Sequence, residues 1–140
     1  MSIRDKRTPE FPDQSDLGYI KLEGDFEFFL SPILDNPQAT DQDEIPGTSG
    51  KFGLEPSNPI PIHGVPNAKI YLESLLLENG EIVDFERIGS VVHLMINLPI
   101  DEYQLYDYSG KKISKLYISP YHKRCSVKIP EGFISLDSYL

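Results

Sequence analysis

The sequence has a single cysteine, no tryptophan and no long apolar run, and each shortage narrows the class of protein. Cys125 has no partner for an internal disulfide, so a reducing compartment is the simplest expectation. No stretch approaches the roughly 20 apolar residues of a membrane-spanning helix. The basic residues near the N-terminus are not followed by the apolar core of a signal peptide. We therefore expect a cytoplasmic protein that makes no membrane contact.

Positive charge is also scarce, and it is unevenly placed. The chain has 22 acidic and 13 basic residues, a net charge of −9. Residues 1–107 hold 20 acidic and 7 basic residues, a net of −13, whereas residues 108–130 hold six basic residues and no acidic one. An acidic body repels nucleic acid and attracts basic partners. The basic segment 111–128 either binds an anion or pairs with the acidic body of the same molecule, and we favour pairing.

Local patterns predict strands more often than helices. The chain has eight tyrosines, seven phenylalanines and twelve prolines in 140 residues, a composition typical of strands and ordered loops. This length suits one domain with an ordinary core. We predict a single mainly β or α+β domain, residues 1–140, with antiparallel strands and little helix.

The clearest turn signal is Asn79-Gly80, which suits the positive φ angles of a type I′ hairpin turn. It predicts that residues 70–78 and 81–88 form an antiparallel hairpin. Pairing outward from the turn places Glu73 opposite Glu86, and puts Asp84 on the same face. Like charges opposite each other would repel if buried, so we expect this face to be largely solvated.

Other strands follow from alternation. Residues 19–30 predict two short strands around Gly24-Asp25, and residues 91–98 predict a strand stopped by Pro99, with a short buried helix as the alternative. Residues 101–119 predict a second hairpin with its turn at Ser109-Gly110. A break in parity between Ile113 and Leu116 indicates a bulge in it. The end of the chain, from residue 133, is expected to form a turn of helix.

Two segments have the composition of unpacked chain. Residues 1–18 are charged and contain two prolines, which predicts a mobile start. Residues 36–51 are rich in acidic residues, glycine and proline and contain few apolar side chains, which predicts a flexible acidic loop.

No catalytic or metal site can be read from residue spacing. His122 and Cys125 lie three apart, but Lys123 and Arg124 between them disfavour a cation, so we predict no metal and no cofactor. His63 could act as a general base in a cleft, and basic neighbours would activate Cys125 if it were exposed. These observations leave one alternative function open, a small enzyme or anion-binding domain built on His63, His122 and segment 111–128.

The sequence gives little support for a phosphate-binding loop or for RNA binding. The glycine-rich run from Gly47 to Lys51 has the wrong spacing for a phosphate loop. Residues 117–124 mix aromatic and basic side chains that could stack on RNA, but the acidic body opposes a polyanion. Nucleic acid is therefore not an expected partner.

Several short motifs lie between residues 52 and 133: Asn58-Pro59-Ile60-Pro61 with Gly64, Tyr71-Leu72, Arg87-Ile88-Gly89-Ser90, Tyr121-His122-Lys123-Arg124 and Pro130-Glu131-Gly132-Phe133. Over this range the chain resembles small uncharacterised bacterial proteins of the immunity type. The resemblance implies a non-enzymatic, partner-binding protein.

The acidic charge independently fits an immunity or inhibitor protein that masks a basic toxin, because opposite potentials speed association. Tyrosines near the same surface would anchor the complex. The acidic side chains that we expect to contact such a partner are Asp41, Asp43 and Glu44 on the loop, and Glu73, Asp84 and Glu86 on the polar face of the predicted hairpin.

Overall fold

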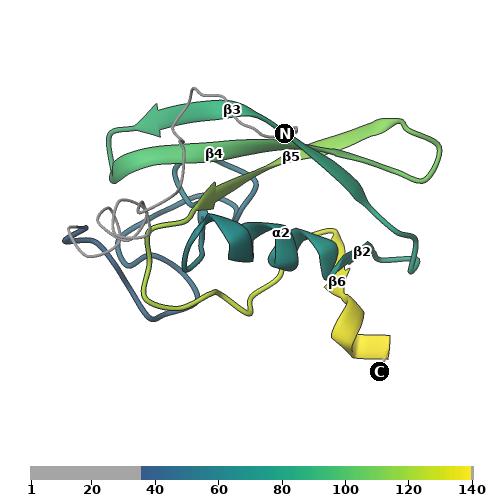
Figure 1. The fold of residues 1–140 in the computed structure, drawn as a ribbon, viewed down its shortest axis with the longest axis horizontal. Coiled ribbons are helices and arrows are strands. Elements are labelled where there is room, and N and C mark those ends of the chain that lie inside the picture. Colours follow the sequence, from purple (N-terminus) through teal and green to yellow (C-terminus); the bar gives the residue numbers. More distant parts are fainter. Residues whose placement is uncertain (1–35, 140) are drawn as a thin grey trace, which may run out of the picture. The chain divides into compact units, whose positions relative to one another are not determined.

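Residues 36–139 are described by a computed structural model of the chain. Within this range strands predominate, with one α-helix and a short 3-10 helix near its end (Figure 1). In chain order the elements are β1 (Ile60–Pro61), α2 (Val65–Glu73), β2 (Leu75–Leu77), β3 (Asp84–His93), β4 (Ile96–Tyr106), β5 (Lys112–Ser119), β6 (Phe133–Ser135) and the 3-10 helix η1 (Leu136–Tyr139). The predicted β-rich class with little helix is confirmed.

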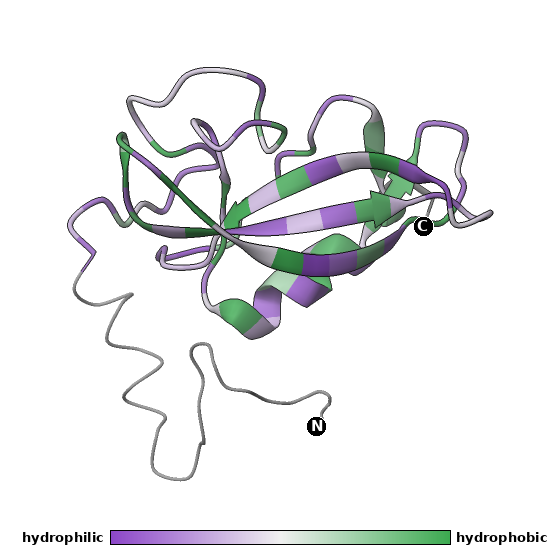
Figure 2. Ribbon diagram, turned by 90° about the horizontal axis from the view of Figure 1, so that it is seen from above, coloured by the Kyte–Doolittle hydropathy of each residue, from purple (hydrophilic) through white to green (hydrophobic). Residues whose placement is uncertain are grey.

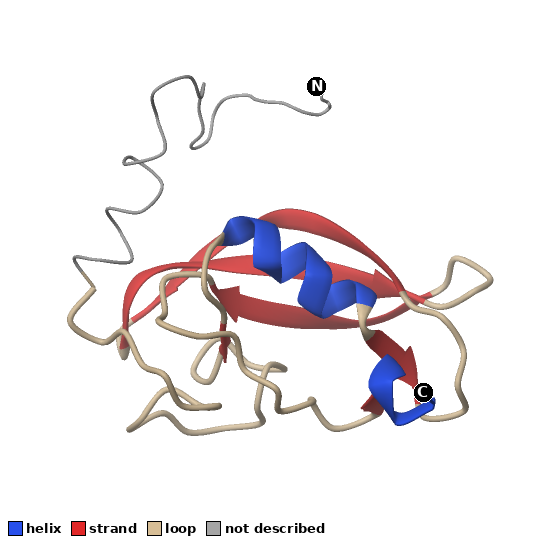
Figure 3. Cartoon of the chain, turned by 60° about the horizontal axis from the view of Figure 1, so that its bottom comes forward, coloured by secondary structure: helices blue, strands red, loops and turns tan. Residues whose placement is uncertain are grey.

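Four strands form one sheet in the order β1-β5-β4-β3. The β5-β4 and β4-β3 pairs are antiparallel, and the two-residue strand β1 joins the edge of β5 in parallel. β2 and β6 form a separate two-stranded antiparallel sheet. Helix α2 lies across one face of the larger sheet (Figure 3).

The main core fills the space between α2 and the sheet. Alternate residues of β4 and β5 face the helix, because side chains alternate between the two faces of a strand. The helix contributes residues three and four apart, which share one helix face. The buried cluster from these elements is Ala68, Tyr71, Leu72, Tyr103, Leu105, Leu116 and Ile118.

The predicted hairpin of residues 70–78 and 81–88 is wrong in its first strand, because residues 65–73 are helical. Pro66 lies in the first turn, where its missing N–H is no loss. Gly64, with a φ of 88°, turns the chain into the helix. Consequently Glu73 ends a helix and does not face Glu86. The leucines that follow it pair with β6 rather than with β3.

The Asn79-Gly80 turn itself is present. Gly80 has a φ of 90°, the N–H of Leu77 donates to the carbonyl of Glu81 over 2.9 Å, and a single bridge joins Leu76 to Ile82. β3 then turns away toward β4. The chain therefore turns where the sequence predicts, but the turn type is different. The N–H of Gly80 donates to the carbonyl of Leu77 over 2.8 Å, so the loop has three residues, 78–80, and not the two of a type I′ turn. The strand pairing inferred from the turn is also wrong.

Residues 91–98 are not one strand. The chain reverses at Leu94 and Met95, between β3 and β4, and Pro99 lies inside β4 instead of stopping a strand. Pairing with β5 begins only at Asp101, and pairing with β3 is irregular nearby. A proline without an N–H is tolerated at such a position.

The second predicted hairpin is confirmed as β4 and β5. Asp107 closes its turn, since its Oδ1 accepts the N–H groups of Ser109 and Lys111, both over 2.9 Å. The register shifts next to Tyr106 and leaves Ile113 without a partner on β4, which is the predicted bulge. The predicted terminal helical turn is η1.

Residues 36–51 lack strands and helices, but they are not an unpacked loop. Ile45 is buried against Ile96, Ile100 and Tyr117 in a second small core, and Asn36 and Thr40 are also buried. The expectation of an unpacked segment is thus corrected: we call residues 36–51 the strap, because they are tied to distant parts of the chain. The predicted mobile start, 1–18, and the predicted strands in residues 19–30 lie outside the described residues.

Candidate functional site

The face of the sheet that points away from α2 carries a group of polar residues from β3, β4 and β5, and we call it the outer face. Opposite residues on paired strands project from the same face. Asp84 pairs with Tyr106, which pairs with Lys112. One row further, Glu86 pairs with Gln104, which pairs with Lys115. Acidic side chains therefore line the outer strand β3, and basic side chains line β5.

Tyr106 links the acidic strand to the centre of the sheet. Its hydroxyl donates to Oε1 of Glu86 over 2.9 Å, and this hydrogen bond raises the pKa of the phenol. Glu86 is exposed, as is Asp84 beside it. The tyrosine thus fixes the orientation of a carboxylate that remains open to solvent.

On the neighbouring part of the outer face, the acidic side chain is paired within the molecule. Glu102 accepts a hydrogen bond of 2.9 Å from Tyr117 and lies 3.4 Å from Nζ of Lys115. By contrast, neither a hydrogen bond nor an ion pair is found for the Asp84 side chain within residues 36–139. The free negative charge of this face is therefore concentrated on β3.

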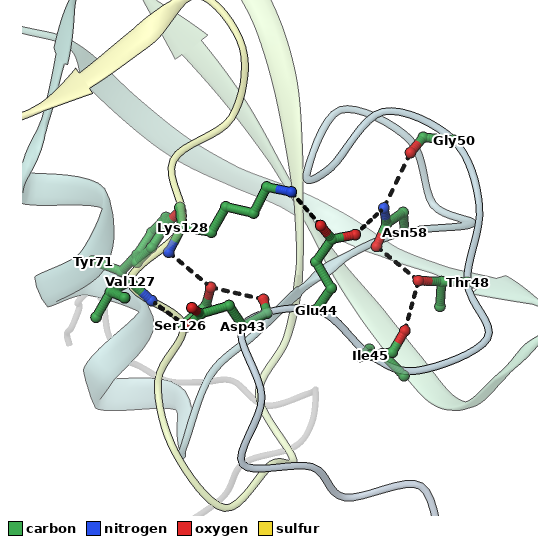
Figure 4. Close-up of polar contacts among 10 residues, drawn as sticks. All are labelled: Asp43, Glu44, Ile45, Thr48, Gly50, Asn58, Tyr71, Ser126, Val127 and Lys128. Atoms are coloured by element: carbon green, nitrogen blue, oxygen red, sulfur yellow. Dashed lines mark hydrogen bonds and ion pairs between the residues drawn. The ribbon is translucent and has the colours of Figure 1, made fainter.

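Asp43, on the strap, is engaged by the C-terminal basic segment (Figure 4). Its Oδ1 accepts the N–H of Val127 over 3.0 Å and lies 3.1 Å from Nη2 of Arg124. The hydroxyl of Ser126 donates to the Asp43 carbonyl over 2.8 Å. The hydrogen bond from Val127, assisted by Arg124, lowers the pKa of the Asp43 carboxyl. Asp43 therefore holds two distant segments together.

Glu44 makes the neighbouring link. Its carboxylate forms an ion pair with Lys128 and accepts a 3.1 Å hydrogen bond from Nδ2 of Asn58, and the Lys128 contact is the main cause of its lowered pKa. Asn58 is almost fully buried, with further bonds to Thr48 and the carbonyl of Gly50, at 3.0 and 3.1 Å (Figure 4). Lys128 also lies 5.3 Å from the centre of the Phe52 ring. Asp43 and Glu44 are thus occupied in holding the strap.

These contacts show how far the basic segment 111–128 pairs with acidic residues of the same molecule. Arg124 and Lys128 pair with the strap and Lys115 pairs with Glu102, as expected if the segment serves the same molecule. Lys112 and Lys123 form no ion pair within the described part of the chain and are exposed. The pairing interpretation holds for half of the six basic side chains.

The remaining two predicted contacts are separated from β3 in the fold. Asp41 is exposed on the strap, and its carbonyl, not its carboxylate, accepts a 2.7 Å hydrogen bond from Arg124. Glu73 lies at the end of α2 and pairs with Lys69 one helical turn earlier, at 3.0 Å. Of the six predicted acidic contacts, only Asp84 and Glu86 lie side by side on one exposed strand.

His122 is buried and has a defined tautomer. Its Nδ1 accepts the N–H of Thr40 over 3.1 Å, so the ring proton is on Nε2, which donates to Oγ of Ser119 over 2.9 Å. Burial lowers the pKa of His122 to about 4. A histidine that donates to the serine cannot accept its proton, so this pair is not arranged for nucleophilic catalysis.

His63 and Cys125 lie beside His122, which residue spacing did not reveal. The Nδ1 of His63 is 2.7 Å from the carbonyl of His122, and the His63 main-chain N–H points at Sγ of Cys125, 3.4 Å away. The sulfur thus contacts the His63 backbone, and Cys125 packs against the main core. Among residues 36–139, no group of three or more histidine, cysteine or acidic side chains is placed to hold a metal ion.

Comparisons with protein-family models, curated proteins and solved structures find no match for this chain. The resemblance to immunity-type proteins therefore stays a prediction. In the part of the chain that the structure describes, no helix is long and apolar enough to cross a membrane.

Proposed function

We propose that this protein is a non-enzymatic, acidic protein-binding module that acts in the cytoplasm as an immunity or inhibitor protein. Its partner is a basic toxin or effector, which it neutralises by covering its functional surface. The observation that carries the proposal is the outer face of β3, where Asp84 and Glu86 are exposed side by side and Tyr106 orients Glu86 at 2.9 Å.

The electrostatics of the whole chain support this role. The net charge of −9 attracts a basic protein at long range. Once the partner is close, oriented carboxylates lose less side-chain freedom than mobile ones when they form ion pairs. A tyrosine among them adds a large, rigid contact, which is typical of residues that dominate binding energy.

Internal ion pairs argue against two of the six acidic residues as partner contacts. Asp43 and Glu44 already have cationic partners within the molecule, so a toxin would have to displace Arg124 and Lys128 to reach them. We therefore assign the partner contact to Asp84, Glu86 and Tyr106, with Asp41 and Glu73 contributing only to the long-range field.

The test is the association rate with the basic protein that co-purifies from native lysate. The variant Asp84→Asn/Glu86→Gln should associate about tenfold more slowly at low ionic strength, and the difference should shrink near 0.15 M salt, where the Debye length is about 8 Å. The matched control is Glu55→Gln/Glu131→Gln, which removes the same charge from exposed loop positions.

The control should keep most of the wild-type rate, because its charges lie outside the four-stranded sheet. Equal rates for all three proteins, or an association rate that does not change with salt, would contradict the electrostatic mechanism. Turnover of a small molecule that requires His63 would instead favour the enzyme alternative.

A further inference from the structure

The turn between β3 and β4 exposes an apolar surface that the acidic face does not explain. Residues 88–100 contain no Asp, Glu, Lys or Arg, in a chain where these make up 25% of residues. Val92 is 81% exposed, Leu94 93% and Met95 56%. Figure 2 shows this turn coloured toward the hydrophobic end of the scale. We propose that residues 92–95 are the anchor that docks into an apolar pocket of the basic partner, an inference that rests on the proposed function.

The backbone of the turn is held in place from outside the hairpin. Gln38, on the strap, uses its side-chain amide as a substitute for a neighbouring strand. Its Nε2 donates to the carbonyl of Met95 over 2.7 Å, and its Oε1 accepts the N–H of Asn97 over 3.0 Å. The Met95 carbonyl lies in the turn and the Asn97 N–H lies at the start of β4, before pairing with β5 begins at Asp101.

The turn is also held from within. Nδ1 of His93 accepts the N–H of Met95 over 3.1 Å. Behind the turn, Ile96 and Ile100 pack with Ile45 in the second core, and Val91 packs against them. The exposed side chains therefore project from an ordered backbone, so docking them costs little backbone entropy.

The net charge of the chain indicates which kind of molecule binds at residues 92–95. A second copy of this chain or an anionic membrane would meet a body of net charge −9, and like charge opposes both. A basic protein is attracted to the same acidic body. The register shift between Arg87 and Gly89 places Val92 on the face opposite Glu86, but β3 is the edge strand of the sheet, so a partner lying along that edge reaches both. At about 3.3 Å per residue, Glu86 and Val92 are about 20 Å apart along the strand. The fitting partner has an apolar pocket at that distance from a cluster of lysine or arginine.

The experiment uses the full chain and a displayed library of random 12-residue peptides as the probe, since 12 extended residues span about 40 Å. Wild type, Val92→Ser/Leu94→Ser and the control Ile70→Ser are compared as bait. Ile70 is also a well-exposed apolar residue, at 63%, but lies on α2. We expect wild type to enrich peptides that combine basic residues with a large apolar residue. Their dissociation rate should rise about tenfold or more on the double variant and stay unchanged on the control.

Each other outcome overturns the anchor, the proposed function or the choice of partner. Basic peptides whose dissociation is unaffected by Val92→Ser/Leu94→Ser would overturn the anchor and leave the proposed function standing. Apolar peptides without basic residues would instead contradict the proposed function. No enrichment over an empty support would overturn the anchor. If wild type forms a dimer in sedimentation and the double variant does not, the occupant is a second copy, and the assignment to a basic partner is wrong.

Discussion

The main-chain N–H of Thr40 donates to Nδ1 of His122 over 3.1 Å, joining residues 82 positions apart in a buried hydrogen bond. A second hydrogen bond lies beside it: the N–H of Lys123 donates to the carbonyl of Thr40 over 3.0 Å. These two bonds attach the start of the strap to the segment that follows β5. The same histidine makes the attachment sensitive to pH.

We expect stability to fall as the pH is lowered from 7 to 5. The folded protein holds the pKa of His122 at about 4, below its ordinary value of 6.5. Between these values the unfolded chain binds a proton that the folded protein does not, so stability rises with pH through this window and is constant above it. The change at residue 122 amounts to about 2 kcal/mol between pH 7 and pH 5.

Urea unfolding at intervals of half a pH unit measures this change. The control is His122→Asn, whose side-chain oxygen can still accept the Thr40 N–H but does not titrate. Its free energy of unfolding should be lower at pH 7 and much flatter from pH 7 to 5. An equally steep dependence in the variant would assign the effect to other groups.

Asn58→Ala should destabilise the protein by about 2 kcal/mol, because it leaves buried polar partners unsatisfied. Asn58 is only 3% exposed and bonds to Thr48, Glu44 and the carbonyl of Gly50. Glu44→Gln should cost less than about 1 kcal/mol, since its ion pair with Lys128 is well solvated. Chemical denaturation compares the two, and a larger loss for Glu44→Gln would reverse our assignment of which residue holds the strap.

In the free protein, amide exchange should be slow at one position on the strap and at one position on the segment after β5. The amides of Thr40 and Lys123 are hydrogen-bonded between the strap and the segment after β5, so we expect protection well above that of an open loop. The exposed amides near Gly47 should exchange quickly and serve as the internal comparison. Fast exchange throughout residues 36–51 would restore the flexible-loop interpretation that the packing of Ile45 corrects.

Gly80→Val should cost about 1 kcal/mol or more, because a β-branched residue resists the φ of 90° found there. Gly80→Asn is the matched control, since asparagine adopts positive φ readily. We expect the asparagine variant to lose less than half as much stability in thermal or urea unfolding. Equal losses would show that the turn is stabilised by something other than the glycine conformation.

Short-range patterns in the sequence were sufficient for the features that are decided locally. The alternation of Tyr103 and Leu105, the turn at Ser109-Gly110 and the parity break at Ile113 predicted the β4-β5 hairpin and its bulge. Side-chain alternation and turn conformation depend on neighbouring residues alone. The same holds for the excess of acidic residues, which is a property of composition.

Tertiary contacts decided the remainder. Residues 70–78 combine leucines that suit a strand or a helix, and the helix forms where Ala68, Tyr71 and Leu72 meet the sheet. The composition of the strap predicts an unpacked loop, yet Asp43, Glu44 and Thr40 find partners more than 80 residues away. Such partners leave no periodic signal, because the pairing depends on how the chain returns to itself and not on spacing. For the same reason, only the folded protein shows that Asp84 and Glu86 remain open on β3 while the acidic residues of the strap are occupied.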